Sequence, residues 1–77
     1  MAERVVVYGS GCKRCQQLKA NAERAVADKG LGVSVGYVTD MGEIATKGFM
    51  AMPVLEVDGK AVVSGRVPDA TEIATLL

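Results

Sequence analysis

Cys12 and Cys15 are the residues of this chain whose type and spacing point most directly to chemistry. A disulfide between them closes a very small ring. By the chain-entropy relation, such a disulfide stabilises the folded state by about 2 kcal/mol, whereas one that closes a long loop contributes about 4–5 kcal/mol. Such a bridge ties no distant parts of the chain together. Permanent disulfides are also uncommon in the reducing cytoplasm, where we expect this chain to work. The pair therefore predicts a redox-active dithiol and disulfide, with no other cofactor.

The alternative use of the cysteine pair is metal binding, because two cysteines at this spacing are half of a zinc site. Completing such a site needs two further ligands, and the chain contains no histidine and no third cysteine. We therefore expect no metal within one chain. A metal ion or cluster shared between two chains stays open as an alternative.

The elements around the pair are predicted to place it at the start of a helix. Residues 4–8 are a continuous run rich in valine, which is typical of a central strand buried on both faces. Residues 9–11 end this run, and a helix is expected over about residues 12–29. Unsatisfied N–H groups and the positive end of the helix dipole favour a thiolate at the first turn. Lys13 and Arg14 add positive charge beside it.

The spacing of three residues is close to one helical turn, so the second cysteine can lie beneath the first. We expect Cys12 to attack a substrate disulfide and Cys15 to resolve the mixed disulfide by attacking the sulfur of Cys12. The substrate leaves reduced, and the same steps in reverse oxidise a substrate. Gly11 and its neighbours Lys13 and Arg14 are expected to support the pair. The expected activity is thiol–disulfide exchange with protein or small-molecule disulfides.

The remaining sequence predicts five further elements. A strand is expected over residues 32–39 and a short helix over 41–47. Two strands joined as a hairpin follow over 54–57 and 60–64, and a last helix begins at residue 68. Asp40 can cap the short helix, and Asp58 with Gly59 is a strong two-residue hairpin signal. Pro68 suits the first turn of the last helix, where Ile73 and the two final leucines form an apolar face.

The resulting order is β-α-β-α-β-β-α. It predicts an α/β fold with a central four-stranded mixed sheet and flanking helices. We expect a single domain over residues 1–77, because the chain shows no linker, repeat or low-complexity segment.

Composition excludes several classes of partner. Nine basic residues balance nine acidic ones, and aromatic residues are only 4% of the chain, too few to stack nucleic-acid bases. No segment approaches the roughly 20 apolar residues of a membrane span. The N-terminus also lacks a signal-peptide pattern. We therefore expect a cytoplasmic monomer that binds neither nucleic acid nor membrane.

Residues 9–15, residues 52–54, and residues 57–60 with 65–68 resemble the thioredoxin-like superfamily and, more narrowly, its small redox-active disulfide proteins. The resemblance covers nearly the whole chain and implies a thioredoxin-like fold. It also implies that the peptide bond before Pro53 is cis and that Pro53 lies against the cysteine pair. By the same resemblance, the backbone of Met52 pairs with a substrate peptide. A proline there lacks an N–H, which we expect to leave a strand edge open to that substrate.

The chain also departs from thioredoxin itself. Gly11 stands where thioredoxin has a tryptophan, and the residues between the cysteines are not its Gly-Pro. Residues 5–7 are apolar and lack the buried acid of thioredoxin, so solvent is the expected acceptor of the Cys15 proton. The pattern around Gly65 and Arg66 does not match the one that holds glutathione in glutaredoxins, and we infer no glutathione binding.

A heavy-metal chaperone of the ferredoxin-like kind is the competing function. Such domains also carry a CxxC after the first strand, but with methionine where this chain has Ser10 and with the order β-α-β-β-α-β. Here residues 68–73 look helical, and Met52 and Pro53 have no use in that fold. The pattern favours an oxidoreductase that acts on disulfide-containing proteins and is recharged by an unidentified upstream reductase.

Overall fold

The computed structural model describes residues 4–11, 13–49 and 51–77. Within these ranges the elements follow the predicted order. They are β1 (Val5–Tyr8), α1 (Lys13–Asp28), β2 (Val35–Val38), α2 (Met41–Thr46), β3 (Val54–Val57), β4 (Lys60–Ser64) and α3 (Ala70–Leu76). Because the order ends in a helix, it differs from the order of a ferredoxin-like metal chaperone.

The four strands form one mixed sheet in the order β2-β1-β3-β4. β1 runs parallel to β2 and antiparallel to β3, and β3 is antiparallel to β4. Tyr8, the last residue of β1, pairs with Val54, the first residue of β3. The segment that leaves β1 and the segment that enters β3 therefore meet at the same end of the sheet. This topology brings the start of α1 close to Met52 and Pro53.

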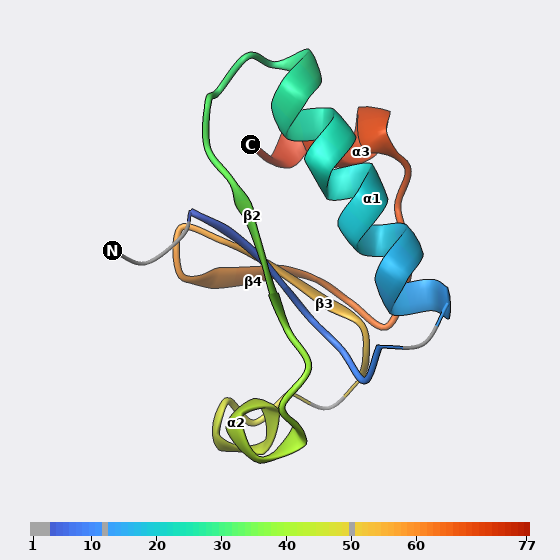
Figure 1. Cartoon of the computed structure of the whole chain (residues 1–77), viewed down its shortest axis with the longest axis vertical. Coiled ribbons are helices and arrows are strands. Elements are labelled where there is room, and N and C mark those ends of the chain that lie inside the picture. Colours follow the sequence, from blue (N-terminus) through green and yellow to red (C-terminus); the bar gives the residue numbers. More distant parts are fainter. Residues whose placement is uncertain (1–3, 12, 50) are drawn as a thin grey trace.

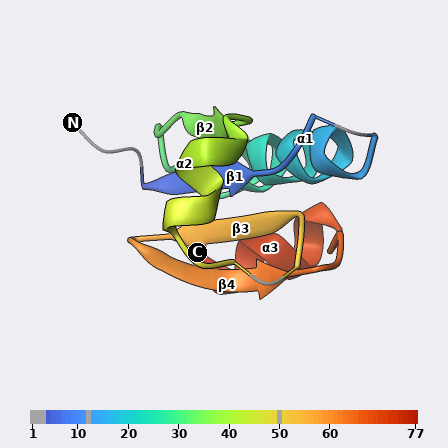
Figure 2. The same cartoon turned by 90° about the horizontal axis from the view of Figure 1, so that it is seen from below.

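The helices cover the sheet unequally. Figure 1 shows α1 and α3 side by side, with α2 apart from them at the end of the sheet where β1 finishes. Figure 2 shows α2 standing away from α1 and α3 across the strands. Val5 and Val7 of β1 belong to the larger core under α1 and α3, whereas Tyr8 belongs to a smaller core with Ile44 of α2. The central position predicted for residues 4–8 is thus confirmed.

The helix predicted over about residues 12–29 is also confirmed, and it buries one apolar face. The buried residues of α1 are Cys15, Leu18, Ala22, Ala25 and Val26. Their spacing puts them on one side of the helix, as burial against a sheet requires. The helix ends before Gly30, whose φ of 62° is the left-handed conformation of a helix C-terminal cap. No helix in the described residues is both long enough and apolar enough to cross a membrane.

The predicted hairpin is confirmed by its backbone. Asp58 and Gly59 have φ angles of 52° and 82° and form the two-residue connection between β3 and β4. Positive φ at both central residues is the type I′ geometry, which matches the twist of the flanking strands. The short helix α2 begins as predicted after Asp40, whose side chain accepts hydrogen bonds from the backbone N–H groups of Gly42 and Glu43.

Three expectations about boundaries and edges were wrong. Pro68 lies outside the last helix, because Asp69 is the N-cap and accepts the Glu72 N–H at 2.8 Å. The second strand is shorter than residues 32–39. Pro53 does not open a sheet edge, because β3 is an inner strand and the Pro53 carbonyl accepts the Gly65 N–H at 2.9 Å.

Candidate functional site

Cys15 lies in the first turn of α1 and has no exposed surface. The sheet end at which β1 finishes holds it from one side, since α1 packs its apolar face on β1. Cys12 falls outside the residues that the structure describes, so its predicted position stays a prediction. The described half of the pair is thus a thiol in the first turn of the helix, shielded from solvent.

Gly9 is the residue that lies closest to this thiol from the strand side. A Cβ built on Gly9 would overlap the Sγ of Cys15, would lie 2.8 Å from its Cβ, and would lie 3.7 Å from the Cβ of Pro53. The backbone of Gly9 is held in place by the bond from its N–H to the Val38 carbonyl at 3.0 Å. Only a residue without a side chain lets the chain pass this close to the sulfur.

Sequence reasoning treated Gly9 only as the residue that ends a strand. Its second role follows from topology, because β1 and α1 approach each other immediately after the strand. A glycine that separates a buried strand from a cysteine-bearing helix was the available signal for such a close approach.

Pro53 lies at the same place, because the Cβ built on Gly9 would contact both Cys15 and Pro53. Its side chain is fully buried, and the Met52–Pro53 peptide bond is cis, as the resemblance implies. Met52 is half-buried. Among the described residues its backbone N–H and carbonyl have no backbone partner, in contrast to the carbonyl of Pro53, which Gly65 binds. The backbone predicted to meet a substrate therefore has hydrogen-bonding groups to offer.

The residues predicted to support the pair have separate tasks. Gly11 has a φ of 86°, a conformation that other residues rarely adopt, and its carbonyl accepts a hydrogen bond from Gln16 Nε2 at 2.9 Å. Arg14 reaches across to the loop after β4, where its Nη2 donates to the Gly65 carbonyl at 2.9 Å. Lys13 and Arg14 are both exposed and keep their charge at the surface in the same helical turn as Cys15.

Arg66 lies in the same loop and is exposed. Its guanidinium forms an ion pair with Glu72 of α3. The hydrogen bond to Glu72, together with that negative charge, raises the pKa of Arg66 above its ordinary value. Arg66 therefore stays charged, and Glu72 partly offsets that charge.

Tyr8 does not join the site. Its buried ring packs edge-to-face on Phe49 with centroids 5.1 Å apart, and its hydroxyl donates to Glu56 at 3.3 Å. Lys47 lies on the same ring and pairs with Glu56 at 3.6 Å. The contact with Tyr8, followed by the charge of Glu56, raises the pKa of Lys47. These contacts hold α2 to the sheet, so Tyr8 is a packing residue.

The burial of Cys15 leads to a prediction about thiol reactivity. In the fully reduced protein, iodoacetamide is expected to modify Cys12 faster than Cys15, by about tenfold or more, because only an exposed thiolate reacts readily. Mass spectrometry of tryptic peptides over time measures both rates in one sample. The denatured protein is the control, where the two rates should converge. Equal rates in the native protein would contradict the prediction.

Comparisons with known proteins agree with this geometry. Residues 3–77 match the sequence profile of the thioredoxin domain. A thioredoxin from Methanothermobacter thermautotrophicus is 36% identical over 74 residues, which cover 96% of each chain. A thioredoxin from Methanocaldococcus jannaschii is 34% identical over 67 residues, or 87% of this chain and 77% of the relative. With its four-stranded mixed sheet and three described helices, this chain belongs to the thioredoxin family and is a thiol–disulfide oxidoreductase.

Proposed function

We propose that the chain exchanges electrons with protein disulfides through Cys12 and Cys15, by way of a mixed-disulfide intermediate. One observation carries the proposal. The thiol of Cys15 lies buried in the first turn of α1, against the backbone of Gly9 and close to the cis-proline Pro53. A thiol held in that place is poorly suited to meet a bulky substrate and well suited to attack a neighbouring sulfur within the chain.

The proposed reaction has two displacement steps. The thiolate of Cys12 attacks one sulfur of the substrate disulfide, the substrate S–S bond breaks, and the first substrate thiolate leaves. Cys15 then loses its proton and attacks the Cys12 sulfur, which breaks the mixed disulfide and releases the second substrate thiolate. The substrate gains two electrons and takes two protons, and the chain ends with a Cys12–Cys15 disulfide. The sulfur atoms of Cys12 and Cys15 supply both electrons, so the proposed reaction needs no cofactor.

The second step needs an acceptor for the proton of Cys15. Among the described residues no polar or charged residue is buried, and Val5, Val6 and Val7 of β1 stand where thioredoxin has an acid. Solvent that enters when the mixed disulfide forms is the proposed acceptor.

The backbone of Met52 is the proposed docking point for the substrate chain. Because Met52 has backbone groups without a partner in the described structure, an extended peptide can pair with it in the manner of an added strand. Pro53 supports this arrangement from within, since its side chain is buried against Gly9 and its carbonyl is bound by Gly65. We further propose that the chain works as a monomer in the cytoplasm, recharged by a separate reductase.

The test is equilibration of the protein in buffers of reduced and oxidised dithiothreitol, with bound metal measured on the same anaerobic sample. We expect one disulfide per chain, formed within the chain. We also expect a two-electron transition, in which a tenfold change in the ratio of oxidised to reduced protein corresponds to about 30 mV of potential. A disulfide between chains would contradict the proposed chemistry. Stoichiometric metal that blocks both thiols would support the shared metal site instead.

A further inference from the structure

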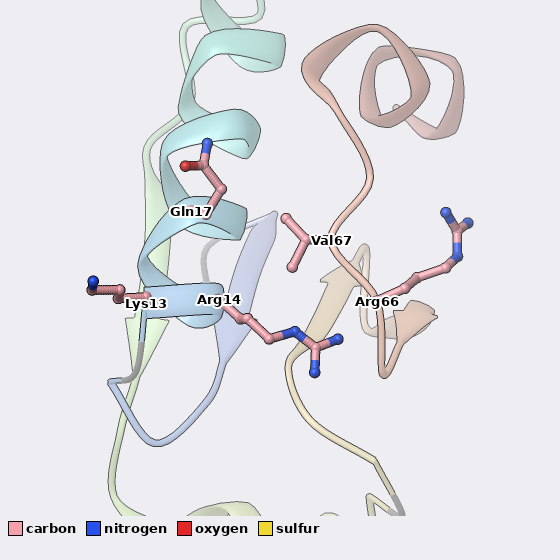
Figure 3. A pocket seen from close by; sticks show the side chains of 5 residues that line it. All are labelled: Lys13, Arg14, Gln17, Arg66 and Val67. Carbon is pink, nitrogen blue, oxygen red and sulfur yellow. The ribbon is translucent and has the colours of Figure 1, made fainter.

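A groove lies between the first turns of α1, which carry Cys15, and the loop that joins β4 to α3. Its volume is about 500 Å³, and it is lined by Lys13, Arg14, Gln17, Arg66 and Val67. Figure 3 shows Arg14 and Val67 extending into the space between the helix and the loop, with Lys13 and Arg66 on its outer sides. Three of these residues are cations and none is an acid. The groove is large enough to receive several side chains of a partner.

The positive charge at this groove is only partly compensated within the protein. The chain is neutral overall, and within the described ranges five of its nine basic residues form ion pairs. In the described part of the chain, the basic residues without an ion pair are Lys13, Arg14, Lys29 and Lys60. Two of these four are consecutive residues that line the groove. Acidic groups are therefore the partner chemistry that this surface lacks.

Hydrogen bonds join the groove to the proposed docking point for substrate. Arg14 Nη2 donates to the Gly65 carbonyl at 2.9 Å, and the Gly65 N–H donates to the Pro53 carbonyl at 2.9 Å. Gly65 is itself tightly placed, because a Cβ there would lie 3.0 Å from the Cβ of Ala51. A peptide paired with Met52 thus has the groove beside it within a few residues of its reacting cysteine.

We propose that this groove selects protein disulfides whose cysteines are flanked by aspartate or glutamate. The substrate carboxylates bind Lys13, Arg14 and Arg66, while its backbone pairs with Met52. The cations come from two separate elements, so carboxylates spaced along a chain fit them better than one compact anion does. This inference rests on the proposed function, since it concerns the substrates of the same cysteine pair.

The test uses two disulfide-linked peptides that differ only in carrying two glutamates or two lysines beside the cysteine. The reduced protein is mixed with each in single-turnover experiments. We expect the second-order rate constant to be about tenfold higher for the acidic peptide at about 20 mM salt. The ratio should fall to about twofold at about 0.5 M salt, because screening shortens the reach of exposed charges.

Matched variants separate the groove from total charge. The double variant Lys13→Gln/Arg66→Gln removes one unpaired lysine and one ion-paired arginine at the groove. The control Arg24→Gln/Lys60→Gln removes the same two kinds of charge elsewhere, since Arg24 pairs with Asp28 and Lys60 has no ion pair in the described structure. We expect the rate ratio to fall to about threefold or less in the first variant and to stay near tenfold in the control. The ratio compares two substrates in one protein, so a change in the cysteine thiolate itself cancels.

The outcomes are distinguishable from a failure of the proposed function. Neutral 2-hydroxyethyl disulfide reports the exchange chemistry without charge, and its complete lack of reaction would overturn the proposed function. Reaction with it but equal rates for the two peptides would overturn the groove proposal alone. Equal ratios in both double variants would also overturn it. A preference confined to a small dicarboxylate disulfide, absent from the peptides, would show that the occupant is not a protein chain.

Discussion

Replacing Cys12 with serine is expected to abolish the reduction of insulin, with a loss of about 1,000-fold or more. The proposed first step needs a sulfur anion, and a serine hydroxyl stays protonated at neutral pH, so it cannot attack a disulfide under these conditions. The measurement is the turbidity of insulin chains with dithiothreitol as reductant, corrected for the rate without protein. Ser10→Ala is the matched control, since it removes a hydroxyl two residues earlier in the chain and should retain activity.

Cys15→Ser is expected to fail in a different way. Without the second thiol the mixed disulfide has no internal route to resolution, so the variant should accumulate covalent adducts with disulfide-containing proteins. Electrophoresis without reductant, followed by treatment with dithiothreitol, detects these adducts. The Cys12→Ser/Cys15→Ser double variant should capture none. Adducts on Cys12→Ser in place of Cys15→Ser would reverse the assignment of the two roles, and full activity of both single variants would refute it.

Gly9→Ala is expected to lower the free energy of unfolding by about 1–3 kcal/mol and to slow disulfide reduction at least tenfold. The added methyl group would overlap the Sγ of Cys15, and the backbone of Gly9 is held by Val38, so the strand cannot easily move away. For 77 residues the total stability is about 4–12 kcal/mol, so this loss is a large share. Urea denaturation of the reduced protein measures it.

Two comparisons make the Gly9 result specific. Gly42→Ala is the same chemical change in α2. There the added Cβ would lie 3.2 Å from Oδ1 of the exposed Asp40 side chain. Its effect on stability should stay within about 1 kcal/mol. In a Cys15→Ala background the Sγ is gone, and the cost of Gly9→Ala should fall by about 1 kcal/mol or more. An unchanged cost in that background would show that the sulfur contact is not the cause.

Much of the architecture around the site is encoded by short-range patterns. The valine run of β1, the apolar spacing of α1, the Asp40 cap and the Asp58–Gly59 turn each depend on residues within a few positions, and the structure confirms them. The boundary at Pro68 was wrong because two neighbouring residues suit a helix start, and the side chain of Asp69 satisfies the Glu72 N–H where proline has nothing to offer. The cis peptide bond between Met52 and Pro53 was predicted only from the resemblance to thioredoxin-like proteins, because a peptide bond before proline is usually trans.

The amino-acid sequence by itself determined the order of elements and a cysteine pair at the predicted start of a helix. Only the tertiary structure brought Gly9, Cys15 and Pro53 together, and only it joined Arg14 to Pro53 through Gly65. The physical reason is the range of the interactions. Periodicity and caps act within a few residues, whereas the contact of Arg14 with Gly65 joins residues 51 positions apart and that of Gly9 with Pro53 depends on which strand lies beside which. A neighbour relation between β1 and β3 leaves no local mark in the chain.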